Sequence, residues 1–390
     1  MAIEGRSDDK KGGRIRLGMV GGGEGAFIGA VHRIASRIDD HYEVVAGALS
    51  STPEKARRSG QALGLAGDRI YDDYESMAKA EAKRADGIEA VAIVTPNNVH
   101  AGPTYAFLKA GIHVICDKPL TVSLAEAKKM RAAVEKSGLV FALTHNYTGY
   151  PLVRRAREMV RAGDLGEIRL VHAEYPQDWL TGAAETKGNK QAEWRVDPKR
   201  SGAGGSLGDI GTHAYNLADF VTGLELTELA AEFTSFGAGR RLDDNAQILL
   251  RYANGARGAI WVSQVAPGNE NGLMLRVYGT KGGFHWRQDN PNYLFWTPHG
   301  QSTRIVTRGG PDAGEAAARV TRVPPGHPEG YLEGFANIYS EAALAIKAAR
   351  VGKKPLKSVH FPTIDDGVKG LAFVEAAVKS SKANGKWVRP

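Results

Sequence analysis

The fold of this chain is decided by residues 14–29, which read RIRLGMVGGGEGAFIG. A short apolar run meets a cluster of glycines, and apolar residues with helical spacing follow from Ile28 to Ile38. A strand, a glycine turn and a helix in this order let the backbone approach a pyrophosphate, because the first N–H groups of the helix can bind an anion. The stretch therefore predicts a dinucleotide-binding domain at the start of the chain.

The glycines fit the dinucleotide fingerprint in two ways. Gly21 and Gly23 match its first two positions, and the third is either Ala26 or, if the turn is three residues longer, Gly29. The residues of this stretch that are expected to bind the cofactor are Gly21, Gly23, Gly25, Ala26, Phe27 and Ile28.

A chain of 390 residues with 42% hydrophobic and 24% charged residues predicts a globular protein of two domains. Residues 1–13 read as a disordered leader without the apolar segment of a secretory signal. No apolar run approaches the roughly 20 residues that span a bilayer, so we expect no membrane partner and a cytoplasmic protein. Cys116 is the single cysteine, which excludes an internal disulfide, and the histidines lack ligand spacing, so no metal is proposed.

The net charge of +8 raises the possibility of nucleic-acid binding. Lysine and arginine are scattered, however, without dense runs or interleaved aromatic residues. A basic balance also suits an enzyme that binds an anionic dinucleotide. We therefore expect a small-molecule enzyme and no nucleic-acid partner.

Apolar runs alternate with helical patterns as far as Tyr150. This rhythm predicts a parallel α/β sheet in a domain covering residues 14–150. After the first strand, the expected strands are 43–49, 88–94, 112–116 and 139–144.

From Glu167 the pattern changes to longer alternating runs, which predict a mainly antiparallel sheet in an α+β domain covering residues 151–390. The expected strands are 168–174, 226–236, 245–252, 258–264 and 274–278. Residues 297–326 read as a Gly/Pro-rich loop, and two helices follow at about 328–350 and 364–379. Whether these terminal helices pack on the first domain is left open.

Ser50 and Ser51 stand at the end of the second strand, where a dinucleotide fold meets the adenosine ribose. An acidic residue there would repel a 2′-phosphate, whereas these hydroxyls and nearby Lys55 suit one. The sequence therefore favours NADP modestly over NAD. Helix capping together with a solvated basic face is the alternative explanation of the same residues.

Thr95, Pro96 and Asn97 end the third strand, and His100 begins the next helix. Open α/β sheets bind ligands at the carboxyl ends of their strands, so these residues are expected near the cofactor. For His100, capping of the helix is an equally good interpretation.

Asp117 and Lys118 end the fourth strand in the same way, and a lysine there can hold a substrate oxygen and transfer its proton. A surface lysine at a strand end is the plainer interpretation. Further along, Asp209 and His213 are four residues apart at the start of a helical segment, so the carboxylate can orient the imidazole as a proton acceptor. A helix cap and a packed core histidine would leave the same pattern.

The glycine-rich turn, Thr95-Pro96-Asn97 with His100, Asp117-Lys118-Pro119 and Asp209-x-Gly-x-His213 occur in an order that resembles the Gfo/Idh/MocA oxidoreductases. The resemblance spans about residues 14 to 380. It implies a Rossmann domain, an open-faced sheet used for oligomerisation, and a homodimer or homotetramer. It also implies that Lys118, Asp209 and His213 form the catalytic set. Asp117 replaces the usual glutamate, and Ser50 with Lys55 resembles the serine/basic pair of NADP-using relatives.

Aromatic and hydrogen-bonding residues in the remaining loops suit a polyol ring, whose apolar face stacks while its hydroxyls are bonded. The expected substrate contacts are Asn146, Tyr147, Asp178, Trp179, Trp194, Arg195, Asp209 and His213.

Together these features predict an NAD(P)-dependent dehydrogenase or reductase that acts on a secondary alcohol or ketone of a sugar, inositol or related cyclic polyol. Two other functions remain open. One is a glycosidase that oxidises its sugar transiently through bound NAD, and the other is a non-catalytic protein that senses the cofactor.

Overall fold

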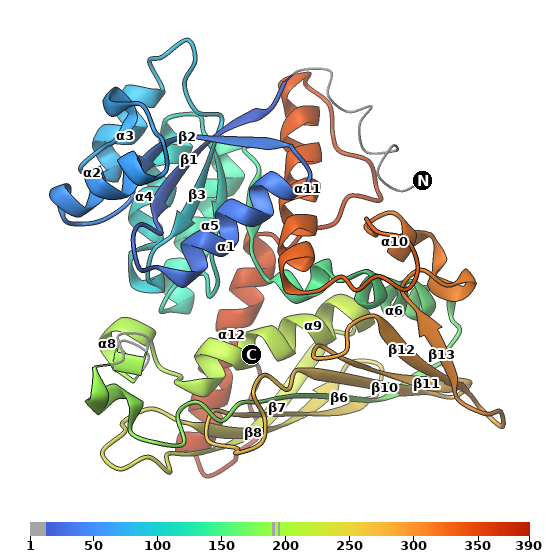
Figure 1. The fold of residues 1–390 in the computed structure, drawn as a ribbon. Helices are drawn as coiled ribbons and strands as arrows, with labels where there is room; N and C mark the ends of the chain where they lie inside the picture. The colour runs from blue at the N-terminus through green and yellow to red at the C-terminus, as the bar shows by residue number, and fades with distance from the viewer. Residues whose placement is uncertain (1–12, 189–191, 194–195) are drawn as a thin grey trace. The chain divides into compact units, whose positions relative to one another are not determined.

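The structure is a computed structural model that describes residues 13–188, 192–193 and 196–390 (Figure 1). The expected leader, except for Gly13, lies outside these residues. The chain divides into two compact units. Of the described residues, one unit comprises 13–121, 125–149 and 331–368, and the other comprises 122–124, 150–188, 192–193, 196–330 and 369–390. Residues 331–368, which the sequence had placed in the second domain, therefore belong to the first unit.

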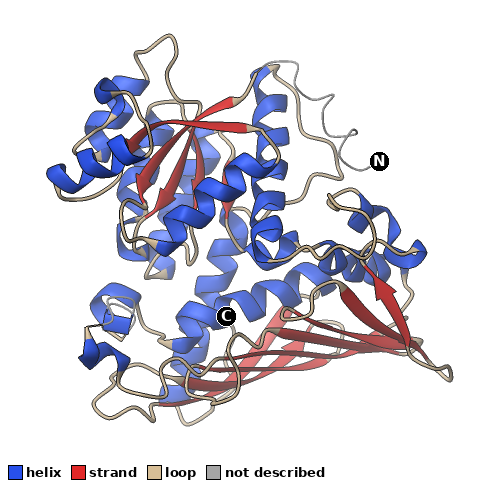
Figure 2. Cartoon of the chain, viewed as in Figure 1, coloured by secondary structure: helices blue, strands red, loops and turns tan. Residues whose placement is uncertain are grey.

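The first unit is built on a parallel sheet with the strand order β2-β1-β3-β4-β5, which confirms the predicted α/β architecture (Figure 2). Its strands are β1 (Ile15–Gly21), β2 (Tyr42–Ala48), β3 (Ala90–Val94), β4 (His113–Cys116) and β5 (Phe141–Leu143). Its helices include α1 (Phe27–Ile38), α2 (Pro53–Ala62), α3 (Tyr74–Glu81), α4 (Ala101–Lys109), α5 (Leu124–Ser137) and α11 (Tyr331–Arg350). Because the strands are parallel, their carboxyl ends share one edge of the sheet.

Helix α11 completes the core of this unit from far along the chain. Phe335 and Tyr339 are buried in one cluster with Ile15 and Leu17 of β1. The Tyr42 hydroxyl also donates to the Tyr339 carbonyl oxygen over 2.9 Å. The first sheet is therefore packed by a helix that begins almost two hundred residues after β5.

The second unit carries a sheet with the strand order β13-β12-β11-β10-β6-β9-β8-β7. The strands are β6 (Ile168–Pro176), β7 (Leu226–Thr234), β8 (Asn245–Tyr252), β9 (Arg257–Ser263), β10 (Met274–Gly279), β11 (Gly282–Arg287), β12 (Tyr293–Pro298) and β13 (Arg304–Thr307). Its helices include α6 (Pro151–Ala162), α8 (Pro198–Ser201), α9 (Thr212–Thr222), α10 (Gly314–Ala318) and α12 (Ile364–Lys382), whose first residues belong to the other unit. The sheet is mainly antiparallel as predicted, but β6 and β9 pair in parallel. The loop expected at 297–326 was wrong in part, because β13 and α10 lie within it.

The two faces of this sheet differ. Helices α6 and α9 lie along one face, toward which Val171, Val277 and Phe284 are buried (Figure 1). The opposite face carries exposed apolar side chains, including Leu249 at 56% and Leu170, which stands opposite Tyr278 in the register. Among the described residues, no helix is both long and apolar enough to cross a membrane.

Candidate functional site

The glycine turn joins β1 to α1, and its backbone explains the glycines. Gly21 and Gly22 have φ values of +77° and +72°, which favour glycine. A Cβ on Gly29 would collide with the backbone of Gly22. Gly29 therefore allows the close packing of helix on turn that the third fingerprint glycine provides, and this favours the longer of the two alignments.

The start of α1 fits the pyrophosphate of a dinucleotide. Among the described residues, no side chain caps this helix, and its first turn holds no acidic residue. A Cβ on Gly25 would meet nothing within 4 Å, so the turn is open on that side. Uncapped N–H groups beside an open glycine turn are the donors that an anion needs.

The end of β2 presents the predicted ribose contacts. Ser50 Oγ accepts the Thr52 N–H over 3.2 Å, and a hydroxyl that accepts one bond can still donate its own hydrogen. Ser51 is exposed and Lys55 half-buried. The neighbouring cations Arg57 and Arg58 form ion pairs with Asp72 and Glu24, at 3.7 and 3.6 Å.

Thr95, Pro96 and Asn97 follow β3 at the same edge of the sheet, as expected. The His100 ring, by contrast, is fully buried, with Nε2 2.8 Å from the Thr95 carbonyl oxygen and Nδ1 3.1 Å from that of Leu120. Burial lowers the pKa of His100, against the opposing charge of Asp117. The ring connects two strand-end loops, which is a structural role, and its contact with the cofactor stays a prediction.

Asp117 and Lys118 end β4. The Thr144 hydroxyl donates to Asp117 Oδ1 over 2.8 Å, and His32 Nε2 lies 3.6 Å from the same oxygen. Burial alone would raise the pKa of Asp117, but His32 and the charge of Lys118 outweigh it and lower that pKa to about 2. The carboxylate therefore stays ionised beside the half-buried Lys118.

His145, Asn146 and Tyr147 follow β5 at this edge, and all three are buried. Burial, helped by the charge of Lys118, lowers the pKa of His145 to about 3, so its ring is neutral at physiological pH. Asn146 Nδ2 has no hydrogen-bond partner among the described residues. A buried amide with an unused donor suits a ligand that carries oxygen acceptors.

In the second unit, Asp209 and His213 lie on a continuous helical segment that begins as the π-helical turn η6 (Leu207–Gly211) and becomes α9. π-Helical turns inside α-helices occur frequently at functional sites. Both side chains are buried, at 8% and 5% exposure, and the His213 ring packs edge-on against Tyr175.

Two further residues hold Asp209 in place. Gln264, just after β9, donates from Nε2 to Asp209 Oδ2 over 3.0 Å. Asp243 accepts the N–H groups of Gly205 and Leu207 over 2.6 and 2.8 Å, and the Ser206 hydroxyl over 2.7 Å. Asp243 therefore fixes the glycine-rich turn that leads into the helix of Asp209.

The loop of the second unit in which substrate contacts are predicted follows β6. Trp179 donates its indole N–H to Gln177 Oε1 over 3.0 Å, and Asp178 is half-buried beside it. Trp194 and Arg195 lie outside the described residues.

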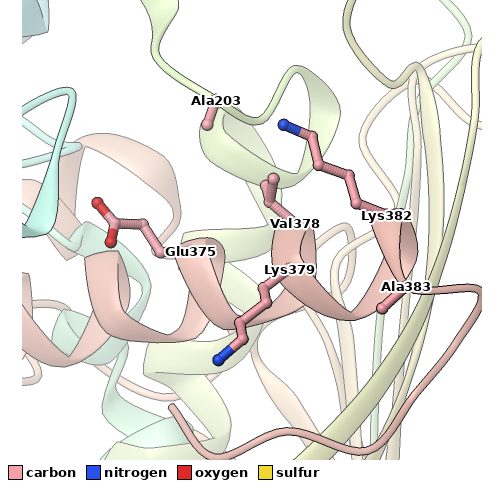
Figure 3. A pocket seen from close by; sticks show the side chains of 6 residues that line it. All are labelled: Ala203, Glu375, Val378, Lys379, Lys382 and Ala383. Carbon is pink, nitrogen blue, oxygen red and sulfur yellow. The ribbon is translucent and has the colours of Figure 1, made fainter.

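A separate pocket of about 400 Å³ lies in the second unit beside the end of α12 (Figure 3). Its lining comprises Ala203, Glu375, Val378, Lys379, Lys382 and Ala383. None of the predicted site residues is among them.

Four residues of the site were not predicted from the sequence: His32, Asp243, Gln177 and Gln264. The first two are distant in the chain from the residues they contact. Gln177 and Gln264 directly follow strands β6 and β9, and a polar residue at a strand end is a signal by which both could have been found.

Comparison with known proteins gives two family matches. The oxidoreductase family with an NAD-binding Rossmann fold matches residues 15–145, and the GFO/IDH/MocA C-terminal domain matches residues 153–285. The uncharacterized oxidoreductase YfiI of Bacillus subtilis is 35% identical over 378 residues, which cover 96% of each chain.

Solved structures are similar over nearly the whole length. An oxidoreductase from Sinorhizobium meliloti shares 60% identity with a TM-score of 0.87, covering 96% of this chain and 99% of the other. An inositol dehydrogenase homolog from Azotobacter vinelandii, complexed with NADH and myo-inositol, shares 36% identity with a TM-score of 0.90, covering 97% and 98%. These matches confirm the resemblance drawn from the motifs: the chain belongs to the Gfo/Idh/MocA family of oxidoreductases.

Proposed function

We propose that this protein exchanges a hydride between NAD(P) and a secondary alcohol or ketone of a sugar, inositol or related cyclic polyol. The observation that carries the proposal is the buried Asp209, held by Gln264 on the helical segment that also carries His213. The similar protein from A. vinelandii was solved with myo-inositol, which supports a polyol as the substrate class.

Bound NAD(P) supplies the hydride acceptor for oxidation of the alcohol and the donor for the reverse reaction. Its pyrophosphate would be held by the N–H groups at the start of α1. Lys118 Nζ holds the carbinol oxygen, and the His213 imidazole takes the hydroxyl proton as the carbonyl forms. Asp209 orients that imidazole and stabilises its charged form. Asn146, Tyr147, Asp178 and Trp179 are proposed to bind the remaining hydroxyls and the ring, together with Trp194 and Arg195.

The test is kcat on a panel of inositols, aldoses and anhydrosugars for Lys118→Ala, His213→Ala and Asp209→Asn, with His299→Ala on the surface as the matched control. Loss of a positioned proton-transfer group costs about 10²–10⁴ in rate. Lys118→Ala and His213→Ala should show that loss, Asp209→Asn a smaller one, and all three should keep their affinity for NAD(P)H. A His213→Ala variant that retains more than about a tenth of kcat would identify His213 as a packed core residue.

The same assay separates the two other functions. A dehydrogenase consumes cofactor in proportion to product, whereas a redox glycosidase releases product without net consumption. A cofactor-sensing protein would bind NAD(P)H and turn over no member of the panel.

For the cofactor, we infer a modest preference for NADP. Ser50, Ser51 and Lys55 at the end of β2 support this, since hydroxyls and a cation suit a 2′-phosphate. Paired fluorescence titrations with NADH and NADPH test it. A tenfold preference for NADH, about 1.4 kcal/mol, would overturn it.

We further propose a homodimer or homotetramer formed through the sheet face that carries Leu170, Leu249 and Tyr278. Exposed apolar side chains on a sheet face favour association. Light scattering that gives only the monomer mass at micromolar concentration would refute this assembly.

A further inference from the structure

A chain of side-chain amides runs along the second sheet from the Asp209 carboxylate. Gln264 Nε2 donates to Asp209 Oδ2 and also lies 3.4 Å from Gln177 Oε1. Gln177 Nε2 donates to Asn271 Oδ1 over 2.8 Å. Gln177 Oε1 also accepts the indole N–H of Trp179 over 3.0 Å. One amide, that of Gln177, therefore contacts both the substrate-loop tryptophan and the glutamine that binds Asp209.

The two ends of this chain determine which way the amides point. Gln264 presents its NH₂ group to Asp209, because the bond to Oδ2 comes from Nε2, which can only donate. An indole N–H only donates, so Gln177 must present its oxygen to Trp179. The Gln177 NH₂ group then faces Asn271, as observed. All the bonds are consistent with a single arrangement, and such networks specify one geometry.

We propose that Gln264 and Gln177 are positioning residues that couple the Trp179 loop to the Asp209 carboxylate. The inference rests on the proposed dehydrogenase function and adds two residues to it. When a substrate ring displaces Trp179, the indole pulls on Gln177, and Gln264 transmits the change to Asp209. The orientation of the carboxylate that supports His213 therefore depends on the ring that occupies the loop.

Because of this coupling, substrates that fit the loop differently should differ in kcat as well as in KM. A substrate that leaves Trp179 in place keeps Gln264 bound to Asp209, whereas a poorly fitting one loosens that bond. Small displacements of a catalytic group are costly, because proximity and orientation supply much of the rate.

The kinetic test uses Gln264→Leu and Gln177→Leu, with Gln301→Leu, an exposed residue after β12, as the matched control. Gln264→Leu should lower kcat about tenfold to a hundredfold, the range that a hydrogen bond to a charged group supplies. In the double variant, kcat should fall by less than the product of the two single fold losses, because Gln177 acts on Asp209 through Gln264. A Gln264→Leu kcat within twofold of wild type, or fully multiplicative losses, would overturn the proposal.

A pH profile separates positioning from packing. The Gln264→Glu side chain can donate to Asp209 only when its own carboxyl is protonated. The kcat of this variant, relative to wild type, should therefore rise as the pH falls from 8 to 6. A ratio that is flat over this range would show that the site needs only the shape of Gln264.

A readout independent of turnover distinguishes failure of this inference from failure of the proposed function. In protein labelled with [¹⁵N]tryptophan, the Trp179 indole resonance is assigned with Trp179→Phe. Gln264→Leu should shift that resonance and Gln301→Leu should not. If wild type turns over no polyol, the proposed function fails, yet a shifted resonance still supports the coupling. An unmoved resonance overturns the coupling whatever the activity.

Discussion

Arg308 and Glu329 form an ion pair withdrawn almost completely from solvent, with Arg308 Nη1 3.0 Å from Glu329 Oε1 and side-chain exposures of 3% and 2%. The guanidinium also donates to the carbonyl oxygens of Val323, Pro324 and His327. One side chain thus ties the end of β13 to the irregular segment before α11.

Replacing Arg308 should therefore destabilise the second unit strongly. Arg308→Met removes the nearer of two cations from the buried Glu329 and leaves it Arg322, whose Nη1 lies 3.8 Å from Oε2. Breaking a buried pair costs about 3–5 kcal/mol, and the remaining cation should place this variant toward the lower end of that range. The double variant Arg308→Met/Glu329→Gln should recover part of the loss, because the buried carboxylate that lost its nearest cation is itself made neutral. Urea unfolding measures both, and an Arg308→Met variant within 1 kcal/mol of wild type would contradict the expectation.

Asp243 gives a second prediction, which concerns activity as well as stability. Asp243→Ala removes the acceptor of three hydrogen bonds from the glycine-rich turn, so Gly205 and Leu207 lose their partners. Unsatisfied buried donors cost about 1–3 kcal/mol each. Both the unfolding free energy and kcat should fall, whereas Asp289→Ala, a surface carboxylate beside Arg287, should leave kcat unchanged. An unchanged kcat in Asp243→Ala would show that the glycine-rich turn keeps its conformation without the Asp243 carboxylate.

Replacing Gly29 should weaken binding of the cofactor. In Gly29→Ala the new Cβ meets the backbone of Gly22, so α1 must move away from the glycine turn. The Kd for NAD(P)H should rise at least tenfold, about 1.4 kcal/mol. Gly67→Ala is the matched control, because a Cβ there meets nothing within 4 Å. Equal affinities of the two variants in fluorescence titrations would rule out Gly29 as the packing glycine.

His145 predicts a pH dependence of stability. Its pKa is about 3 in the folded protein, lowered first by burial, against about 6.5 in the unfolded chain. Between these values the unfolded state binds a proton that the folded state does not, so stability falls as the pH decreases from 6.5 toward 3. At pH 5 the loss from this group is about 2 kcal/mol.

The variant His145→Gln should remove this part of the acid destabilisation. Its unfolding free energy should change less between pH 7 and pH 5 than that of wild type, in urea titrations at both values. His299→Gln, at an exposed histidine, should leave the difference as it is in wild type. An unchanged pH dependence in His145→Gln would mean that His145 is not a source of acid sensitivity.

The elements that the sequence predicted well are those whose signal is local. Strand β8 at Asn245–Tyr252 matches the expected bounds because its alternation is uninterrupted, and α2 begins at Pro53 after the expected Ser/Thr cluster. The ends of β3 and β4 also carried the expected polar residues. Polar residues at strand ends can be assigned to one site from the local sequence, because the carboxyl ends of parallel strands lie at one edge of the sheet.

What the sequence could not predict depends on contacts between distant residues. The two carbonyl partners of His100 belong to different loops. The position of His100 at the start of a helix therefore could not predict that its ring connects these loops. The short strand β13 falls in a stretch rich in glycine and proline, and only its pairing with β12 makes it a strand. Gln264 approaches Asp209 from another element, 55 positions away.

The position of α11 determines which fragments of this protein can fold. Because Phe335 and Tyr339 fill the core around β1, a fragment that ends at residue 150 would expose the side chains they cover. Such a fragment should be insoluble unless residues 331–368 are supplied, either in trans or joined through a linker. During synthesis, the core of the first sheet likewise cannot be completed until α11 leaves the ribosome, which happens after the whole second sheet has been made.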